Sequence, residues 1–126
     1  MNIIVYVFLI NAIISNEVPI LTKENFSLII GHHSLVFINF SKSWCSHCTL
    51  FREEFRKVHI RSLKAENKIP LYELSESEDE IFDFYGVTEY PTAILFYNSL
   101  PLVYKGPKFE YEMFDWIYRV QNPTET

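Results

Sequence analysis

The chain has 126 residues, the length of one domain. Hydrophobic residues make up 48% of it and aromatic residues 17%, enough for a packed core, and its two cysteines are too few for a disulfide scaffold. A net charge of −5, with no basic face in the sequence, argues against a nucleic-acid-binding protein.

The chain begins with an almost wholly apolar stretch at residues 3–14. About a dozen apolar residues is the length of a signal peptide and is too short for a membrane-spanning helix. Ser15 is a small residue that suits a cleavage point, although no Lys or Arg precedes the stretch. We therefore predict a signal peptide at residues 1–16. A core element of the domain and an uncleaved anchor are the alternatives.

A short helix and a buried strand are expected next. Thr22 precedes an amphipathic stretch in which Phe26, Ile29 and Ile30 share one face, which predicts a capped helix. Residues 35–40 are a nearly continuous apolar run, typical of a central strand that is buried on both faces.

A long helix is expected over residues 45–67, because the apolar side chains follow helical spacing and the interior lacks Gly and Pro. The positions expected on its inner face are Leu50, Phe51, Phe55, Val58 and Leu63. A strand at residues 70–74 and a short helix at residues 78–85, stopped by Gly86, follow it.

The last part of the chain predicts a hairpin and a closing helix. Strands at residues 92–97 and 100–104 are joined by a polar turn, and a helix at residues 110–120 precedes a flexible tail at residues 122–126. The element order β-α-β-α-β-α-β-β-α predicts an α/β fold: a mixed central sheet with helices on both faces.

Cys45 and Cys48 lie directly after the buried strand, at the start of the long helix. A helix N-terminus carries partial positive charge and free N–H groups, which favour a thiolate at Cys45. The thiolate is the form that attacks disulfides, so Cys45 is the expected nucleophile. Cys48 lies one turn on, close enough to resolve the mixed disulfide. His47 can hydrogen-bond or place positive charge near the thiolate, which makes the disulfide more oxidising.

A zinc site and a structural disulfide are two other uses of this cysteine pair. A zinc site would need two further ligands, and among the four histidines only the adjacent His32 and His33 come close together in the sequence. A purely structural disulfide across so small a ring would restrict almost no chain entropy. We therefore predict a redox pair and no metal.

The motif Trp-Cys-Ser-His-Cys at residues 44–48 resembles the active site of the protein disulfide isomerase family, whose domains have the thioredoxin fold. Residues 21–26, 85–92 and 104–108 are also similar to segments of that family. The resemblance covers about residues 18–120 and is far more specific than an isolated Cys-x-x-Cys.

The resemblance implies a thioredoxin-like domain over residues 17–121. It also implies a cis Tyr90–Pro91 bond that faces the cysteines and leaves the preceding backbone free to bind an extended substrate. Trp44 would be a partly exposed platform beside them. Substrate binding is therefore expected at Trp44, Tyr90 and Pro91.

The sequence departs from the family at one position below the cysteines. The family usually has a buried acid on the central strand that relays protons to the resolving thiol, and this chain has Asn39 there. An amide cannot act as a base, so the release of Cys48 as a thiolate should be slower. The resemblance thus implies an active but slow enzyme.

The resemblance implies a thiol–disulfide oxidoreductase that forms, reduces or isomerises disulfide bonds. Its expected partners are unfolded or disulfide-containing secretory proteins, and it is expected to be a monomer without a stable membrane span. No cofactor is needed, because the cysteine pair itself carries two electrons. The endoplasmic reticulum lumen is the expected location, with secretion as the alternative because the C-terminus lacks a retention signal. A thioredoxin-like reductase and a non-catalytic chaperone (holdase) are the alternative functions.

Overall fold

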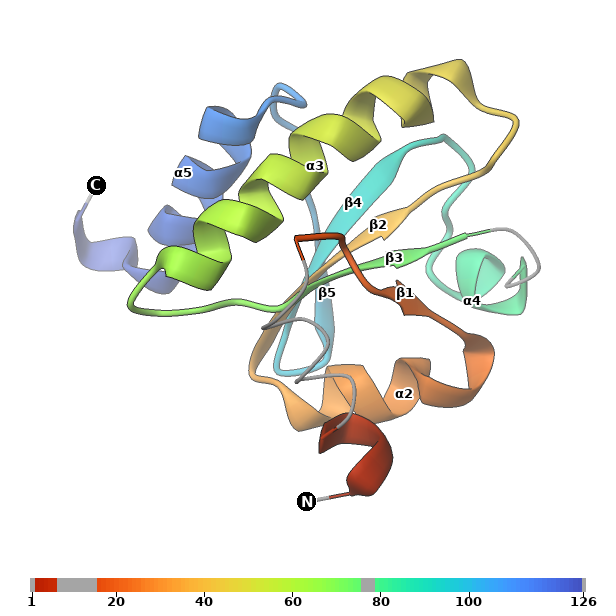
Figure 1. Cartoon of the computed structure of the whole chain (residues 1–126), viewed down its shortest axis with the longest axis horizontal. Helices are drawn as coiled ribbons and strands as arrows, with labels where there is room; N and C mark the ends of the chain where they lie inside the picture. Colours follow the sequence, from red (N-terminus) through yellow and green to blue (C-terminus); the bar gives the residue numbers. More distant parts are fainter. Residues whose placement is uncertain (1, 7–15, 76–78, 126) are drawn as a thin grey trace.

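The computed structural model describes residues 2–6, 16–75 and 79–125 of the chain (Figure 1). Most of the predicted signal peptide, at residues 7–15, and Glu78, the predicted start of the third helix, lie outside these described residues. The centre of the fold is a five-stranded sheet with the strand order β1-β3-β2-β4-β5. The strands are β1 Ile20–Leu21, β2 Leu35–Phe40, β3 Leu71–Leu74, β4 Thr92–Tyr97 and β5 Leu100–Val103.

The sheet is mixed, as predicted. Strand β3 pairs in parallel with β1 and β2, whereas β4 pairs antiparallel with β2 and β5. The central strand β2 has the bounds that its apolar run predicts. In the β2–β3 register, Asn39 lies opposite Glu73.

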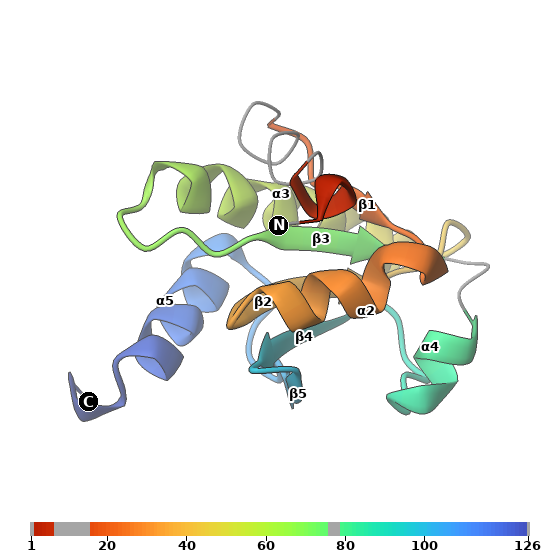
Figure 2. The same ribbon diagram turned by 90° about the horizontal axis from the view of Figure 1, so that it is seen from below.

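Helices cover both faces of the sheet (Figure 2). Two hydrophobic clusters form the core: one joins the sheet to α2 and α4, and the other joins it to α3 and α5. The helices are α2 Lys23–His32, α3 Ser46–Lys64, α4 Asp79–Phe84 and α5 Glu110–Gln121, followed by the short 3₁₀ helix η1 Pro123–Glu125. The predicted two-sided α/β architecture is confirmed.

The alternation of side chains along β2 decides what lies beneath α3. Val36, Ile38 and Phe40 pack in the cluster with α2 and α4, and Phe37 packs in the cluster with α3 and α5. Successive side chains of a strand point to opposite faces, so Asn39 shares the face of Phe37. The polar residue of this strand therefore lies on the side of α3.

Helix α3 differs from its prediction at two side chains and at both ends: it begins at Ser46, with Cys45 as its N-cap, and Leu63, which was expected on the inner face, is only partly buried. It stops at Lys64, and Leu50, which was expected on the inner face, is 74% exposed. The helical rotation of about 100° per residue that turns Phe51 inward turns Leu50 toward solvent. The inner face is completed by polar residues instead; the buried positions are Cys48, Phe51, Phe55, Val58, His59 and Ser62.

One tight turn follows α4, and another joins the two strands of the hairpin. Gly86 follows α4 with a φ of 66°, a left-handed conformation that glycine adopts without steric cost. Asn98 and Ser99 join β4 to β5 with φ of 49° and 70°, the two positive values of a hairpin turn whose twist matches its strands. Both turns lie where the sequence predicts them.

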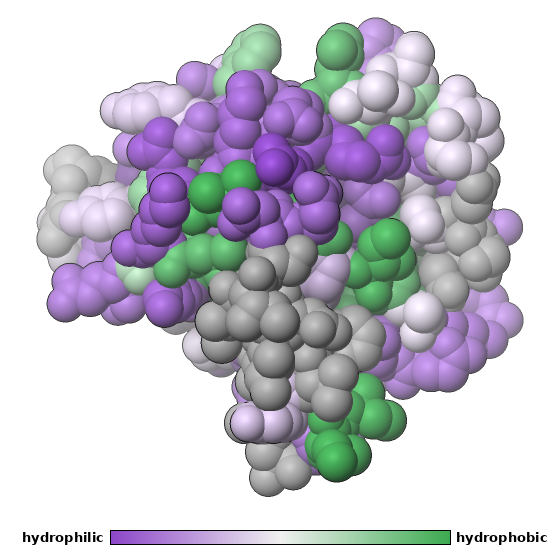
Figure 3. Space-filling model, in the orientation of Figure 1, coloured by the Kyte–Doolittle hydropathy of each residue, from purple (hydrophilic) through white to green (hydrophobic). Residues whose placement is uncertain are grey.

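The exposed surface of α3 is mainly hydrophilic, while a hydrophobic cluster covers the first helical turn of the chain (Figure 3). In that first turn Ile3 is 75% and Ile4 is 51% exposed.

Within the described residues, no helix combines the length and the apolar character needed to cross a membrane. The signal peptide stays a prediction.

Candidate active site

Cys45 lies where the chain leaves the sheet and enters α3. It is the N-cap of this helix, and its Sγ accepts a hydrogen bond of 3.1 Å from the backbone N–H of Cys48. Its thiol also lies 3.5 Å from the backbone carbonyl oxygen of Tyr90. A sulfur at a helix N-terminus is well placed to carry negative charge, because the first N–H groups have no partner within the helix.

Cys48 is the more deeply buried of the two free thiols. It is fully buried, whereas Cys45 is 7% exposed. Burial raises the pKa of the Cys48 thiol, and its hydrogen bond with Cys45 acts in the same direction. Hydrogen bonds from the Lys42 backbone and the Ser41 side chain act against that rise. The pair thus combines a slightly exposed sulfur with a fully buried one whose ionisation is disfavoured.

The segment that precedes β4 forms the opposite wall of the site. The Tyr90–Pro91 bond is cis, and the Tyr90 carbonyl faces the sulfur of Cys45. Trp44 is 71% exposed and meets the Tyr90 ring edge-to-face, with 5.7 Å between the ring centroids. His47 lies in the first turn of α3 with its side chain exposed. The structure therefore brings together the residues from Trp44 to Cys48 and the Tyr90–Pro91 segment.

Lys42 is a buried cation next to this site that the sequence reasoning missed. Its Nζ lies 2.8 Å from Oδ1 of Asp79, 4.4 Å from the centroid of the Phe82 ring and 5.6 Å from that of Tyr90. Aromatic ring faces attract cations. Lys42, which lies just before the cysteines in the chain, therefore links their segment both to α4 and to Tyr90. The position of Lys42 just before the motif is the only signal in the sequence.

A second group lies below Cys48, and of its members the sequence analysis identified only Asn39. Asn39 is fully buried, and its Nδ2 donates to Oε1 of Glu73 over 3.5 Å. Arg52 donates to the same carboxylate oxygen from Nε over 2.9 Å and to Oγ of Ser41 from Nη2 over 3.0 Å. A carboxylate thus lies near the family's acid position, but on the neighbouring strand. The spacing of Cys48 and Arg52, four residues apart on one helix, could have indicated that Arg52 lies on the face of Cys48, but it does not indicate Glu73.

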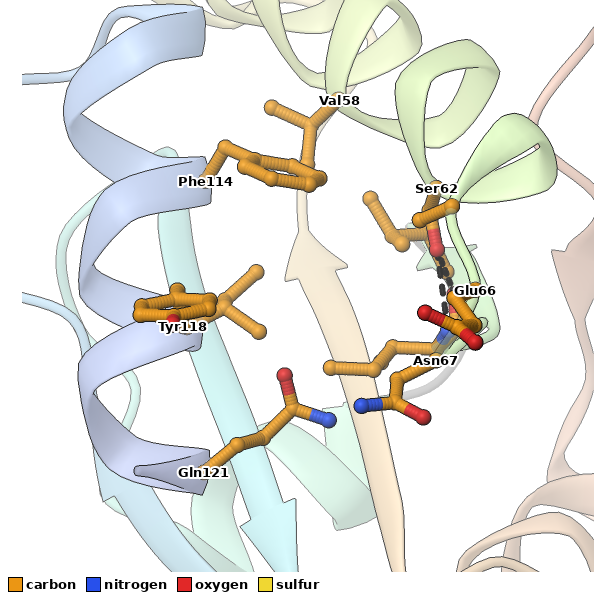
Figure 4. Close-up of a pocket in the computed structure, with 11 residues that line it drawn as sticks. Val58, Ser62, Glu66, Asn67, Phe114, Tyr118 and Gln121 are labelled. Atoms are coloured by element: carbon orange, nitrogen blue, oxygen red, sulfur yellow. Dashed lines mark hydrogen bonds between the residues drawn. The ribbon is translucent and has the colours of Figure 1, made fainter. Parts of the chain in front are cut away.

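A cavity of about 260 Å³ lies at the other end of α3, between that helix and α5 (Figure 4). Val58, Phe114 and Tyr118 line it together with polar side chains such as Glu66 and Gln121. None of the predicted site residues lines this cavity. In the part of the chain that is described, no three His, Cys, Asp or Glu side chains are grouped so that they could hold a metal ion.

Comparison with known proteins identifies similar sequences. The family model described as thioredoxin matches residues 17–119. Protein disulfide-isomerase A4 of Rattus norvegicus is 29% identical over 104 residues, which are 82% of this chain and 16% of the rat protein. Probable protein disulfide-isomerase A4 of Caenorhabditis elegans is 35% identical over 94 residues, 73% of this chain and 15% of the nematode protein. The chain therefore corresponds to a small part of each relative.

Solved structures show the same arrangement of elements. The first thioredoxin domain of mouse protein disulfide-isomerase A4 matches with a TM-score of 0.79 at 23% identity and covers 89% of this chain and 81% of that domain. Human ERp44 matches with a TM-score of 0.74 at 21% identity, over 84% of this chain and 30% of that protein. At these identities the likeness is one of fold.

Proposed function

Because the chain belongs to the thioredoxin family, we propose that it is a thiol–disulfide oxidoreductase that works through Cys45 and Cys48. The predicted thioredoxin fold and the predicted relation to protein disulfide isomerases are confirmed. One observation carries the proposal: the Cys45 sulfur caps α3, accepts the Cys48 N–H over 3.1 Å and faces the Tyr90 carbonyl.

Two exchange steps follow from this geometry. The Cys45 thiolate attacks one sulfur of a client disulfide, so that a mixed disulfide forms and the first client thiol leaves. Cys48 then attacks Cys45 Sγ, the Cys45–Cys48 disulfide forms and the second client thiol leaves. The client disulfide gains two electrons and the cysteine pair loses two. The reverse sequence oxidises a client dithiol.

Client binding is proposed at the wall opposite the cysteines. The Tyr90 carbonyl faces Cys45, and an extended peptide can approach this backbone as it would approach a strand edge. Trp44 presents a large exposed ring on the same side. Proposed clients are therefore unfolded or disulfide-containing chains of the secretory pathway. We propose an auxiliary catalytic role for His47, because its exposed ring can place positive charge near the Cys45 thiolate.

The second step should limit turnover. Cys48 is fully buried, its pKa is raised by that burial, and Asn39 below it offers an amide instead of a base. We therefore propose a slow enzyme in which mixed disulfides accumulate before they are resolved. The proposed location is the endoplasmic reticulum lumen, supported by the relation to protein disulfide isomerases, and secretion is the alternative.

The test compares Cys45→Ser with Cys48→Ser in a disulfide-reduction assay on insulin. We expect Cys45→Ser to abolish reduction and Cys48→Ser to retain a stable mixed disulfide at Cys45, visible by non-reducing electrophoresis and mass spectrometry. Thr49→Ser, at an exposed position of the same helix, is the control and should behave as the unchanged protein. If Cys45→Ser reduces insulin at the original rate, the proposal is wrong.

A non-catalytic chaperone is the second candidate, favoured by the 71% exposure of Trp44. The Cys45→Ser/Cys48→Ser double variant separates the two functions, because a holdase would still suppress aggregation of an unfolded protein without either thiol. The reduction potential of the pair distinguishes the remaining alternative. A value near that of isomerases, about −180 mV, supports the proposal, and one near −270 mV would indicate a thioredoxin-like reductase.

A further inference from the structure

A polar cluster lies on the face of the sheet beneath α3, below the resolving cysteine. Asn39 and Ser41 are fully buried, and Glu73 on β3 is 8% exposed. These side chains interrupt an otherwise apolar layer between the sheet and the helix. Polar groups are costly to bury unless they are hydrogen-bonded, so their arrangement needs a physical reason.

Arg52 connects the cluster. Its guanidinium donates from Nε to Glu73 Oε1 over 2.9 Å and from Nη2 to Ser41 Oγ over 3.0 Å. Asn39 Nδ2 donates to the same Glu73 oxygen over 3.5 Å. The planar guanidinium presents its N–H groups in a fixed geometry, so the bond to Glu73 also fixes the bond to Ser41.

The Ser41 hydroxyl has one hydrogen to donate. Its oxygen accepts from Arg52, which leaves that hydrogen for another acceptor. Cys48 and Arg52 are four residues apart on α3 and therefore share one face of the helix. The Ser41 side chain hydrogen-bonds with Cys48 and thereby lowers the pKa of that thiol, against the larger effect of burial. Ser41 thus lies between the cation and the sulfur.

We propose that Arg52, held by Glu73, is a positioning residue for the resolving step, because it orients the Ser41 hydroxyl to donate to the Cys48 sulfur as the thiolate forms. This inference rests on the proposed function and names the group that assists its second step. In that step Cys48 Sγ bonds to Cys45 Sγ, the bond between Cys45 and the client sulfur breaks, and the Cys48 proton ends on the departing client thiol.

The cluster stabilises a thiolate and does not relay a proton. An arginine side chain stays protonated, so a proton cannot pass from Ser41 through Arg52 to the Glu73 carboxylate. The Glu73 carboxylate is itself engaged by Arg52 and Asn39. Beneath Cys48 this chain therefore has a hydrogen-bond donor, the Ser41 hydroxyl, instead of a base.

Other titratable and charged groups belong to the same region of the fold. Cys45 raises the pKa of the Cys48 thiol further, and the remaining groups are the exposed His47 at the start of α3, Lys42 after β2, Asp79 of α4 in its ion pair with Lys42, and Glu73 of β3. The Arg52 variants retain all of these residues, and Arg52→Met removes only the ion pair between Arg52 and Glu73 and the bond from Arg52 to Ser41.

The test resolves the two thiol-exchange steps with a small aromatic disulfide that releases a coloured thiolate. The first release reports attack by Cys45, and the second reports resolution by Cys48. We expect Arg52→Met to slow the second release about tenfold at pH 7 and to move its pH profile about one unit upward, without changing the first release. Arg52→Lys, which keeps a cation, should recover part of the rate. Arg56→Met, one turn along α3 in an ion pair with Glu53, is the matched control.

A double-variant cycle shows whether Arg52 acts through Ser41. We expect Ser41→Ala to slow the second release, and Arg52→Met to have no further effect in the Ser41→Ala background. The inference is overturned if the pH profiles of Arg52→Met and Arg56→Met coincide, or if Arg52→Met slows resolution equally with and without Ser41. If Ser41→Ala fails to fold, the Arg52→Met and Arg52→Lys profiles still decide the matter. A protein that resolves the small disulfide normally but does not act on insulin would contradict the proposed function alone.

Discussion

Trp44 is 71% exposed beside Cys45, and its ring is nearly perpendicular to the Tyr90 ring. An exposed side chain contributes little to folding, so Trp44→Ala should change the free energy of unfolding by less than about 0.5 kcal/mol. The loss of an aromatic contact to the client should raise the KM for insulin about fivefold, equivalent to about 1 kcal/mol, with kcat nearly unchanged. Steady-state kinetics over a range of insulin concentrations measure both values.

Tyr111→Ala is the matched control for Trp44→Ala, because Tyr111 is an aromatic residue on α5 with 68% exposure. Its removal should leave KM and stability as they are. An equal rise of KM in both variants would mean that Trp44 contributes only general surface hydrophobicity and no local contact with the client.

His33 ends α2 with a half-buried ring, whose Nε2 has no hydrogen-bond partner among the described residues. Burial, and secondarily the charge of His32, lowers the pKa of His33 from 6.5 to about 4. The folded protein therefore binds this proton less readily than the unfolded chain. The stability linked to neutral His33 is complete above pH 6.5 and is lost as the pH falls toward 4.

Urea unfolding at pH 7.5 and at pH 5 tests this dependence on His33. Because the ring is partly exposed and water screens part of the penalty, His33→Gln should remove only about 1 kcal/mol of the difference between the two pH values. His32→Gln, at the exposed neighbouring position, is the control and should retain most of the difference. The same pH difference in His33→Gln as in the unchanged protein would contradict the assignment.

At the scale of the element, α3 carries two apolar side chains with opposite surroundings. Phe55 is 1% exposed and packs against Phe37 and Phe51, with ring centroids 5.1 and 5.6 Å away, whereas Leu50 is 74% exposed. Phe55→Ala should lower the free energy of unfolding by about 3–5 kcal/mol, because it leaves a cavity between α3 and the sheet. Leu50→Ala should change it by less than about 0.5 kcal/mol.

Urea denaturation of the two variants decides which face of α3 is buried. Both substitutions shorten an apolar side chain on the same helix, so each serves as the control for the other. Similar losses at Leu50 and Phe55 would mean that the helix is rotated relative to the sheet, and the position of Arg52 below Cys48 would then be wrong too.

At the scale of the whole molecule, Glu54 joins α3 to α5. Its Oε1 accepts the backbone N–H of Glu110 at the start of α5 over 2.9 Å. The hydrogen bond from Lys57, followed by that from Glu110, lowers the pKa of the Glu54 carboxyl below its ordinary value of 4.5. The stabilisation is therefore present above pH 4.5 and is lost as the pH falls below this value.

Glu54→Ala should lower the free energy of unfolding by about 1 kcal/mol at pH 7, because an N-terminal N–H of α5 loses its acceptor. Glu53→Ala is the control, since Glu53 is more exposed and its ion pair with Arg56 lies on the surface of α3. Thermal unfolding at pH 7 and pH 3.5 measures the effect. If Glu54→Ala loses as much stability at pH 3.5 as at pH 7, the carboxylate is not the cause of the loss.

The sequence alone predicts those elements and residues that depend on local pattern. The apolar run of β2, the break at Gly86 and the polar turn at Asn98 and Ser99 each lie where they are expected, because backbone preference and hydrophobic periodicity act over a few residues. The position of Cys45 directly after the apolar run and before the helical pattern likewise predicts a sulfur at a helix N-terminus, and the structure places Cys45 as the N-cap of α3.

Only the tertiary structure decides which polar groups surround the two thiols. Asn39 and Glu73 are 34 residues apart, Arg52 and Glu73 are 21 apart, and Lys42 and Asp79 are 37 apart, each pair on different elements. Such pairs depend on strand register, on helix rotation and on which face of the sheet each side chain occupies, and none of these follows from local spacing. The sequence therefore determines that this chain has a thiol pair at a helix start. Its tertiary packing decides that an arginine, a serine and a carboxylate from the next strand lie beneath the resolving thiol.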